Sequence, residues 1–231
     1  MAFKKKSSHK KIYFAIILLA LLIAASVAAI MAMQPSNKLV VGVHVGDTFT
    51  YEIRGFSNLS SIGAVETAGF AHLNDTDYYK VSITNVNGTS VSLDTLWRFK
   101  DGTQTTGQQT IDLSNGLKTD PKNGFWAIYA GNLKVGDKLR PTSADTVVVN
   151  ASDTMDYADS SRVRNYMSIG GESQLATDPT KSTLRYDSIL VYFDKQTGML
   201  ESMIWITDYN NPLMREVTTW TLVDTSVWAV Q

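Results

Sequence analysis

Three aspartates recur at every third position late in the chain, where carboxylate oxygens are the groups that a hard cation would need. Asp153, Asp156 and Asp159 have this spacing and are the candidates for a cation site. A spacing of three puts side chains on one side only in a helix, and the sequence lacks the central Gly and final Glu of a helix–loop–helix calcium site. We therefore predict no metal site and no cofactor, with these acids solvating a loop and pairing with Arg162 or Arg164.

The residues that usually perform nucleophilic or general-base catalysis are scarce. His44 and His72 stand alone in the sequence, outside any metalloprotease, hydrolase or phosphate-loop motif. Cysteine is absent, which excludes thiol catalysis and Cys-type zinc sites. The 22 acidic residues offer many carboxylate pairs for glycoside hydrolysis but favour none of them. We predict no catalytic residue and no enzyme, with an envelope hydrolase kept as an alternative.

The aromatic residues are the features that best indicate binding. Tryptophan can form a stacking platform for a sugar or the wall of an apolar pocket, although on an alternating strand it more often faces the core. Among five tryptophans, Trp97 and Trp205 are the candidates for ligand binding. The ligand itself stays unknown. Four Asn-x-Ser/Thr motifs also occur, and they make glycosylation candidates of Asn58, Asn74, Asn87 and Asn150.

An uncharged run of apolar residues near the start of the chain, Ile12–Met33, decides where those residues act. Its 22 residues are long enough to span a bilayer as a helix. Five lysines precede it, so the positive-inside rule keeps residues 1–11 cytoplasmic and exports everything after Met33. We predict a basic tail (1–11), a transmembrane helix or signal anchor (12–33), a linker (34–38) and an extracytoplasmic domain (39–231). Cleavage near Ala29 or Ala32 would instead secrete the domain.

Charge and size restrict what the exported part can be. All 22 acidic residues but only 16 of the 21 basic ones follow the apolar run, which leaves a net charge of −6. Nucleic-acid binding depends on clustered Lys and Arg, so we predict no nucleic-acid partner. The membrane is the one partner that the sequence indicates, through Ile12–Met33. An exported part of about 200 residues is long enough to bury a single core without disulfides.

The elements that must position these residues read as strands. Phe49, Tyr51 and Ile53 alternate with polar residues, which is typical of a half-buried strand. Further strands are predicted from Tyr79, over 91–99, near 111–113, and over 146–150, 162–169, 188–194, 199–207 and 217–223, with a first one at 39–45. The segment 55–76 is expected to be a loop with a short helix, and the apolar run 125–130 has no readable period.

The connections between these strands indicate the fold class. Asn87-Gly88 and Asp101-Gly102 suit tight hairpin turns, and such short connections join only antiparallel neighbours. The sequence therefore predicts a mainly β fold, one antiparallel domain built as a sandwich or as a partly open barrel of curved sheet. Two segments, VHVGD at 43–47 and LKVGD at 133–137, also echo one another, which turn chemistry alone can explain.

Two later stretches, MDYADSSRVRNY (155–166) and YFDKQTGMLES (192–202), resemble a recurring pattern in archaeal exported proteins of unknown function. That pattern has a Tyr-Ala-Gly-like turn followed by an Arg and a strand, and then an aromatic-Asp-Lys-x-Thr-Gly-x-Leu-x-Glu hairpin. This chain has Asp159 where the pattern has Gly. The resemblance implies an N-terminally membrane-anchored, β-rich protein with no established activity.

These observations favour an extracytoplasmic β domain, anchored in the cell membrane, that acts in binding or as a component of the cell envelope. An alternative is a lipid carrier whose half-barrel holds an acyl or isoprenoid chain. That alternative requires a deep apolar cavity lined by residues such as Trp97 or Trp205.

Overall fold

The computed structural model describes residues 39–120, 124–174 and 183–230, and Leu39 begins the compact unit to which all of them belong. The predicted cytoplasmic tail, membrane helix and linker (1–11, 12–33 and 34–38) lie outside the described residues. Among the described residues, no helix has the length and apolar character needed to cross a membrane.

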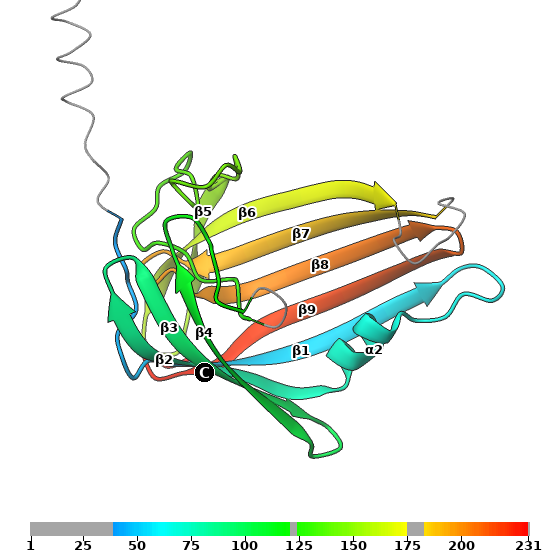
Figure 1. Cartoon of the computed structure of the whole chain (residues 1–231), viewed down its shortest axis with the longest axis horizontal. Helices are drawn as coiled ribbons and strands as arrows, with labels where there is room; N and C mark the ends of the chain where they lie inside the picture. The colour runs from blue at the N-terminus through cyan, green and yellow to red at the C-terminus, as the bar shows by residue number, and fades with distance from the viewer. Residues whose placement is uncertain (1–38, 121–123, 175–182, 231) are drawn as a thin grey trace, which may run out of the picture. The chain divides into compact units, whose positions relative to one another are not determined.

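Nine strands form one antiparallel sheet, which confirms the mainly β prediction (Figure 1). The sheet order is β4-β3-β2-β1-β9-β8-β7-β6-β5, so β4 and β5 are its edges and no second sheet packs against it among the described strands. A single short helix, α2 (Ala68–Asn74), accompanies the sheet in the described part of the chain. The strands are β1 (Thr48–Leu59), β2 (Thr76–Asn87), β3 (Ser90–Phe99), β4 (Gln104–Asp112), β5 (Ala151–Asp156), β6 (Ser161–Gln174), β7 (Leu184–Asp194), β8 (Leu200–Asn210) and β9 (Leu213–Thr225).

Strand β1 lies next to the central strand of the sheet, β9, and pairs with β2 on its other side. Its predicted alternation is confirmed, because Phe49, Tyr51 and Ile53 are all buried on one face, called the inner face below. The strand runs further than expected, through Gly55, which the sequence assigned to a loop. A Cβ at Gly55 would lie 2.7 Å from the Phe70 ring, so the absence of a side chain lets α2 pack on the strand there.

The described residues between β4 and β5, 113–120 and 124–150, form no strand and fill the inner face where β1 begins (Figure 1). Its apolar residues from Phe125 to Ala130, apart from the half-buried Trp126, are buried. Backbone bonds fasten it to the β7–β8 hairpin: the Tyr129 N–H donates to the Gly198 carbonyl (2.9 Å), and the Leu200 N–H donates to the Ala127 carbonyl (3.1 Å). A segment that is buried on all sides shows no alternation of apolar and polar residues, which is why the sequence pattern could not assign this run.

Two expected strands are wrong. In 39–45 the one bridge joins Val40 to Gly131, and in 146–150 the one bridge joins Val148 to Lys138, with further backbone hydrogen bonds between 147–149 and 136–139. The first segment lies against the 195–198 turn, where a Cβ at Gly42 would come within 1.9 Å of a backbone oxygen. Close packing against irregular backbone therefore replaces a regular ladder.

The two Val-Gly-Asp segments fold alike. In each, the aspartate carboxylate accepts a hydrogen bond from the backbone N–H three residues earlier, of His44 (2.7 Å) or of Lys134 (2.8 Å). In each, the glycine has a positive φ, 96° in the first and 89° in the second. The sequence echo thus marks two copies of one local turn.

Candidate functional site: two clefts beside the helix

Helix α2 lies on the inner face and contacts β1 and β9 (Figure 1). Thr67 is its N-cap, and the Thr67 hydroxyl accepts a hydrogen bond from the Phe70 N–H (3.2 Å). Because α2 sits over the middle of the sheet, it separates the rest of that face into two clefts. One cleft opens toward β2–β4 and the other toward β7–β9, and each contains one of the two tryptophans predicted as ligand-binding residues.

The Trp97 cleft has a volume of about 200 Å³ and lies between α2, β2, β3 and β4. Its aromatic rings pack on one another: the Trp97 ring centroid lies 4.8 Å from that of His72, 5.1 Å from that of Phe99 and 5.7 Å from that of Tyr79. The Trp97 indole N–H donates to the Thr76 hydroxyl (2.7 Å). Trp97 is therefore part of a packed aromatic wall, and its rings already have partners.

The Trp205 cleft has a volume of about 160 Å³ and lies between α2 and strands β7, β8 and β9. Three aromatic rings line it, from Phe70, Trp205 and Tyr209. None of these rings has an aromatic or cation–π partner among the residues that the structure describes. The other lining residues are Thr67, Gly69, Leu73, Arg185, Thr207, Glu216 and Thr218.

An ordered polar network fixes the orientation of Trp205. One oxygen of Asp187, Oδ1, accepts bonds from the Trp205 indole (2.9 Å), the Thr207 hydroxyl (2.8 Å) and the Arg185 guanidinium (2.8 Å). Burial would raise the pKa of Asp187, but these donors and the charge of Arg185 hold it below its usual value. The guanidinium in turn has a raised pKa, because the bonds and charge of Asp187 outweigh its own burial. The two groups therefore form an ion pair that keeps both charged.

Glu216 is the second carboxylate of this cleft, and it is only 5% exposed. Its two oxygens accept bonds from the Thr67 N–H (2.6 Å) and the Thr67 hydroxyl (2.8 Å), which ties β9 to the start of α2. No ion pair neutralises Glu216 among the described residues. The cleft thus combines unstacked aromatic rings, hydroxyl groups and two carboxylates, Asp187 and Glu216, that act on the single guanidinium of Arg185.

Glu201 is a chemically unusual residue that the sequence did not single out. It is 3% exposed at a bulge of β8, and neither carboxylate oxygen has a hydrogen-bond partner of normal geometry among the described residues. Burial raises the pKa of Glu201 to about 7, the nearby Asp194 charge acts in the same direction, and Tyr157, Arg164 and Arg162 oppose the shift. Neither cleft beside α2 reaches Glu201, so its protonation bears on stability and not on ligand binding.

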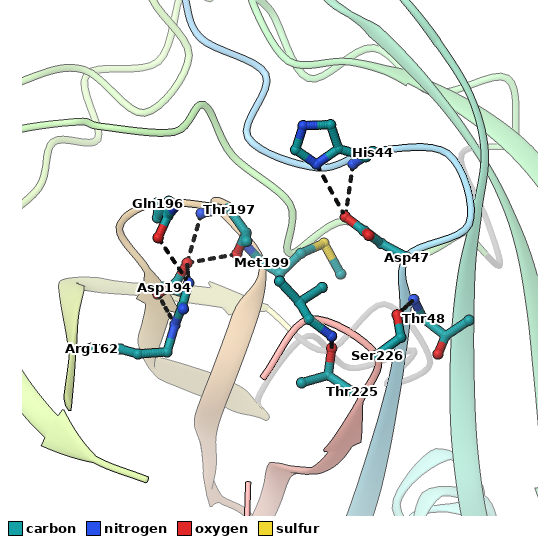
Figure 2. Close-up of polar contacts among 11 residues, drawn as sticks. His44, Asp47, Thr48, Arg162, Asp194, Gln196, Thr197, Met199, Thr225 and Ser226 are labelled. Atoms are coloured by element: carbon teal, nitrogen blue, oxygen red, sulfur yellow. Dashed lines mark hydrogen bonds and ion pairs between the residues drawn. The ribbon is translucent and has the colours of Figure 1, made fainter. Parts of the chain in front are cut away.

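Asp194 explains why the Asp-Lys-x-Thr-Gly sequence folds as it does. Figure 2 shows Arg162, Gln196 and Thr197 gathered around it. The buried carboxylate accepts two bonds from Arg162 (2.9 and 3.0 Å) and two from the N–H and hydroxyl of Thr197 (2.6 and 2.8 Å). Arg162 also lies over the Trp228 ring, 4.1 Å from its centroid. The motif that carries the archaeal resemblance therefore builds a turn in this chain.

The three aspartates proposed for a cation do not converge. Asp153 forms a bidentate ion pair with Arg164 (2.7 and 2.9 Å), as expected for one of the two arginines. Asp156 accepts from the Ser161 hydroxyl, and Asp159 accepts from the Ala229 N–H (3.0 Å) and so holds the C-terminal segment. The loop expected around these acids is wrong for Asp153 and Asp156, which lie in strand β5, where a spacing of three points side chains to opposite faces. The described residues contain no cluster of three or more potential metal ligands.

His44 and His72, the two described histidines, lie in different surroundings. The His44 side chain is 84% exposed, with its Nδ1 atom 3.8 Å from Asp47, and Figure 2 shows it apart from the Asp194 turn. His72 belongs to the aromatic wall of the Trp97 cleft. The Thr48 N–H donates to the Ser226 hydroxyl oxygen (2.9 Å), a bond that joins the start of β1 to the residue after β9.

The four glycosylation candidates differ in exposure. Asn58, Asn87 and Asn150 are exposed, whereas Asn74 is half-buried and its oxygen accepts a bond from the Gly55 N–H (2.7 Å). Three of the four candidates are therefore exposed in the fold, and glycosylation of all four stays a prediction.

Comparison of the chain with protein-family models and with curated proteins gives no match. The interpretation of the site therefore rests on its own chemistry. The sequence pointed to Trp205 but not to its neighbours Arg185, Asp187, Thr207 and Glu216, because they come from three strands whose register alone brings them together.

Proposed function

We propose that this protein is a membrane-anchored binding domain on the outer side of the cell membrane, and that the Trp205 cleft holds its ligand. The helix predicted at Ile12–Met33 would be the anchor, and residues 39–231 would form the extracytoplasmic domain. The acidic exported part and the resemblance to archaeal exported proteins support this placement.

The main support for the proposal is that the three aromatic rings of the Trp205 cleft do not stack on other rings of the described chain. Aromatic rings in a core normally pack on one another, as they do around Trp97. Phe70, Trp205 and Tyr209 instead face a shared space with charged and hydroxyl groups at its walls. A small apolar space with a few oriented polar groups is the usual form of a ligand site.

The size and lining of the cleft favour a small polar ligand. Its volume of about 160 Å³ is well below the roughly 300–1,000 Å³ of sites for drug-sized molecules. Carboxylate, guanidinium and hydroxyl groups line it or lie beside it, unlike the deep apolar cavity that a lipid carrier requires. We therefore propose a binding function for a small polar ligand, without a catalytic step.

The test is a thermal-unfolding screen of the full chain in a non-ionic detergent against a panel of small sugars, amino acids, organic cations and organic anions. We expect at least one class to raise Tm, because a ligand that binds only the folded state stabilises it. The Trp205→Ala variant should lose that increase, whereas His72→Ala, which changes an exposed ring of the other cleft, should keep it. A panel with no stabilising member, or equal loss in both variants, would contradict the proposal.

A further inference from the structure

We propose that the ligand of the Trp205 cleft is a small organic cation, an alkylammonium or quaternary ammonium group no larger than choline. This inference rests on the proposed binding function and names the chemical class of the ligand. It follows from the charges of the cleft, from its aromatic rings and from its size.

The charges at the cleft do not balance. Arg185 and Asp187 neutralise one another through an ion pair in which Nε lies 2.8 Å from Oδ2. Glu216, which is 5% exposed and lies in no ion pair of the described residues, acts on the same Arg185 guanidinium, so two carboxylates share one positive charge. Buried charges are normally paired, because removing an ion from water is costly without a counter-charge. A ligand with one positive charge would supply that partner, and an anion would meet an excess of negative charge.

The rings provide the second requirement of a cation site. The face of an aromatic ring carries partial negative charge, and tryptophan attracts cations best. Phe70 comes from α2, whereas Trp205 and Tyr209 come from β8, so the rings border the space from two elements. The indole N–H of Trp205 donates to Asp187 (2.9 Å), which fixes the orientation of the ring that lines the cleft.

The volume of the cleft limits the size of the ligand. A space of about 160 Å³ admits a trimethylammonium group or a short alkylamine but not a nucleotide or a peptide. The Arg185 guanidinium lines the same space but is not stacked on an aromatic ring, since among the described residues the stacked arginines are Arg140, Arg162 and Arg164. The rings of the Trp205 cleft therefore have no cation stacked on them from within the described chain.

The experiment is isothermal titration of the full chain, in an alkyl maltoside detergent, with choline and with 3,3-dimethyl-1-butanol, a neutral molecule of nearly the same shape. We expect choline to bind at least tenfold more tightly than the alcohol. Glu216→Gln should reduce choline affinity at least tenfold, and Glu172→Gln, which changes an exposed acid of β6, should leave it unchanged. Trp205→Ala should abolish binding.

The outcomes separate this inference from the proposed function. Equal or tighter binding of the alcohol, or binding of acetate instead of choline, would overturn the cation class while a ligand site at Trp205 stands. Choline affinity that is unchanged in both Glu216→Gln and Trp205→Ala would place the site elsewhere and overturn the inference. If Glu216→Gln unfolds because it loses the Thr67 contacts, the comparison of choline with the alcohol on the unchanged chain still decides the question.

Discussion

Glu201 lies in an environment that favours its protonated form. Burial raises the pKa of this carboxyl from an ordinary value of 4.5 to about 7 in the folded chain. A raised carboxyl pKa means that the folded state holds a proton that the unfolded state has already released between these two values. Its contribution to stability is therefore complete below pH 4.5 and is lost as the pH rises through 7. Deprotonation leaves a buried carboxylate without a normal hydrogen bond.

Glu201→Gln should remove this dependence, because the amide stays neutral at every pH. The shift corresponds to about 3 kcal/mol of unfolding free energy, at roughly 1.4 kcal/mol per pKa unit. We expect the variant to be more stable than the original chain above pH 8, by up to about 3 kcal/mol, and the difference to shrink toward pH 4.5. Urea unfolding at several pH values measures it. A difference that is constant across this range would contradict the assignment.

At the scale of the element, the β7–β8 hairpin depends on one buried carboxylate. Asp194 joins Arg162 of β6 to the Thr197 turn, and a Cβ at Gly198 would come within 2.1 Å of the Tyr129 carbonyl oxygen. Gly198 also has a positive φ of 76°, which favours glycine. The turn and the irregular core segment therefore constrain each other.

Asp194→Asn should destabilise the fold by about 3 kcal/mol, because it leaves the largely buried Arg162 without its counter-charge. The matched control is Asp153→Asn, which breaks an ion pair whose aspartate is 49% exposed. An exposed pair contributes about 1 kcal/mol or less, so the control should change little. Denaturant midpoints measure both variants. Equal effects of the two substitutions would show that burial does not set the strength of the Asp194 pair.

Helix α2 is the element that divides the inner face, and its position depends on contacts distant in sequence. The N-cap residue Thr67 bonds to Glu216, and Gly55 leaves room for Phe70. The sequence predicted a short helix somewhere in 55–76, since capping and composition act locally. It could not predict where the helix docks, because Glu216 lies 149 residues away.

At the scale of the whole molecule, strand patterns predicted most of the sheet and little of the site. Alternation such as Phe49-Tyr51-Ile53 reports one buried face and can be read without knowledge of partners. The sequence did not predict the core segment 113–150, whose described residues form no strand, because a segment buried from several sides shows no period. The sequence also did not predict that Arg185, Trp205 and Glu216 lie close together, because their proximity arises only from the strand order β7-β8-β9.

The proposed topology is open to direct chemical labelling, because the chain has no cysteine of its own. We expect Val135→Cys, at a site that is 58% exposed, to react with a membrane-impermeant maleimide in intact cells. A cysteine introduced at Ser8, in the basic tail, should react only after the membrane is permeabilised. Protection of Val135→Cys in intact cells would contradict an extracytoplasmic domain.

The central claim is that ligand binds beside Trp205 and not beside Trp97, and the five indole N–H groups of the chain report on it directly. The measurement is a titration of the ¹⁵N-labelled full chain with choline, followed through its indole resonances. The Trp205 resonance is identified by its absence in Trp205→Phe. We predict that choline shifts the Trp205 resonance most and leaves that of Trp97 in place. A shift of Trp97 with Trp205 unmoved would contradict the account.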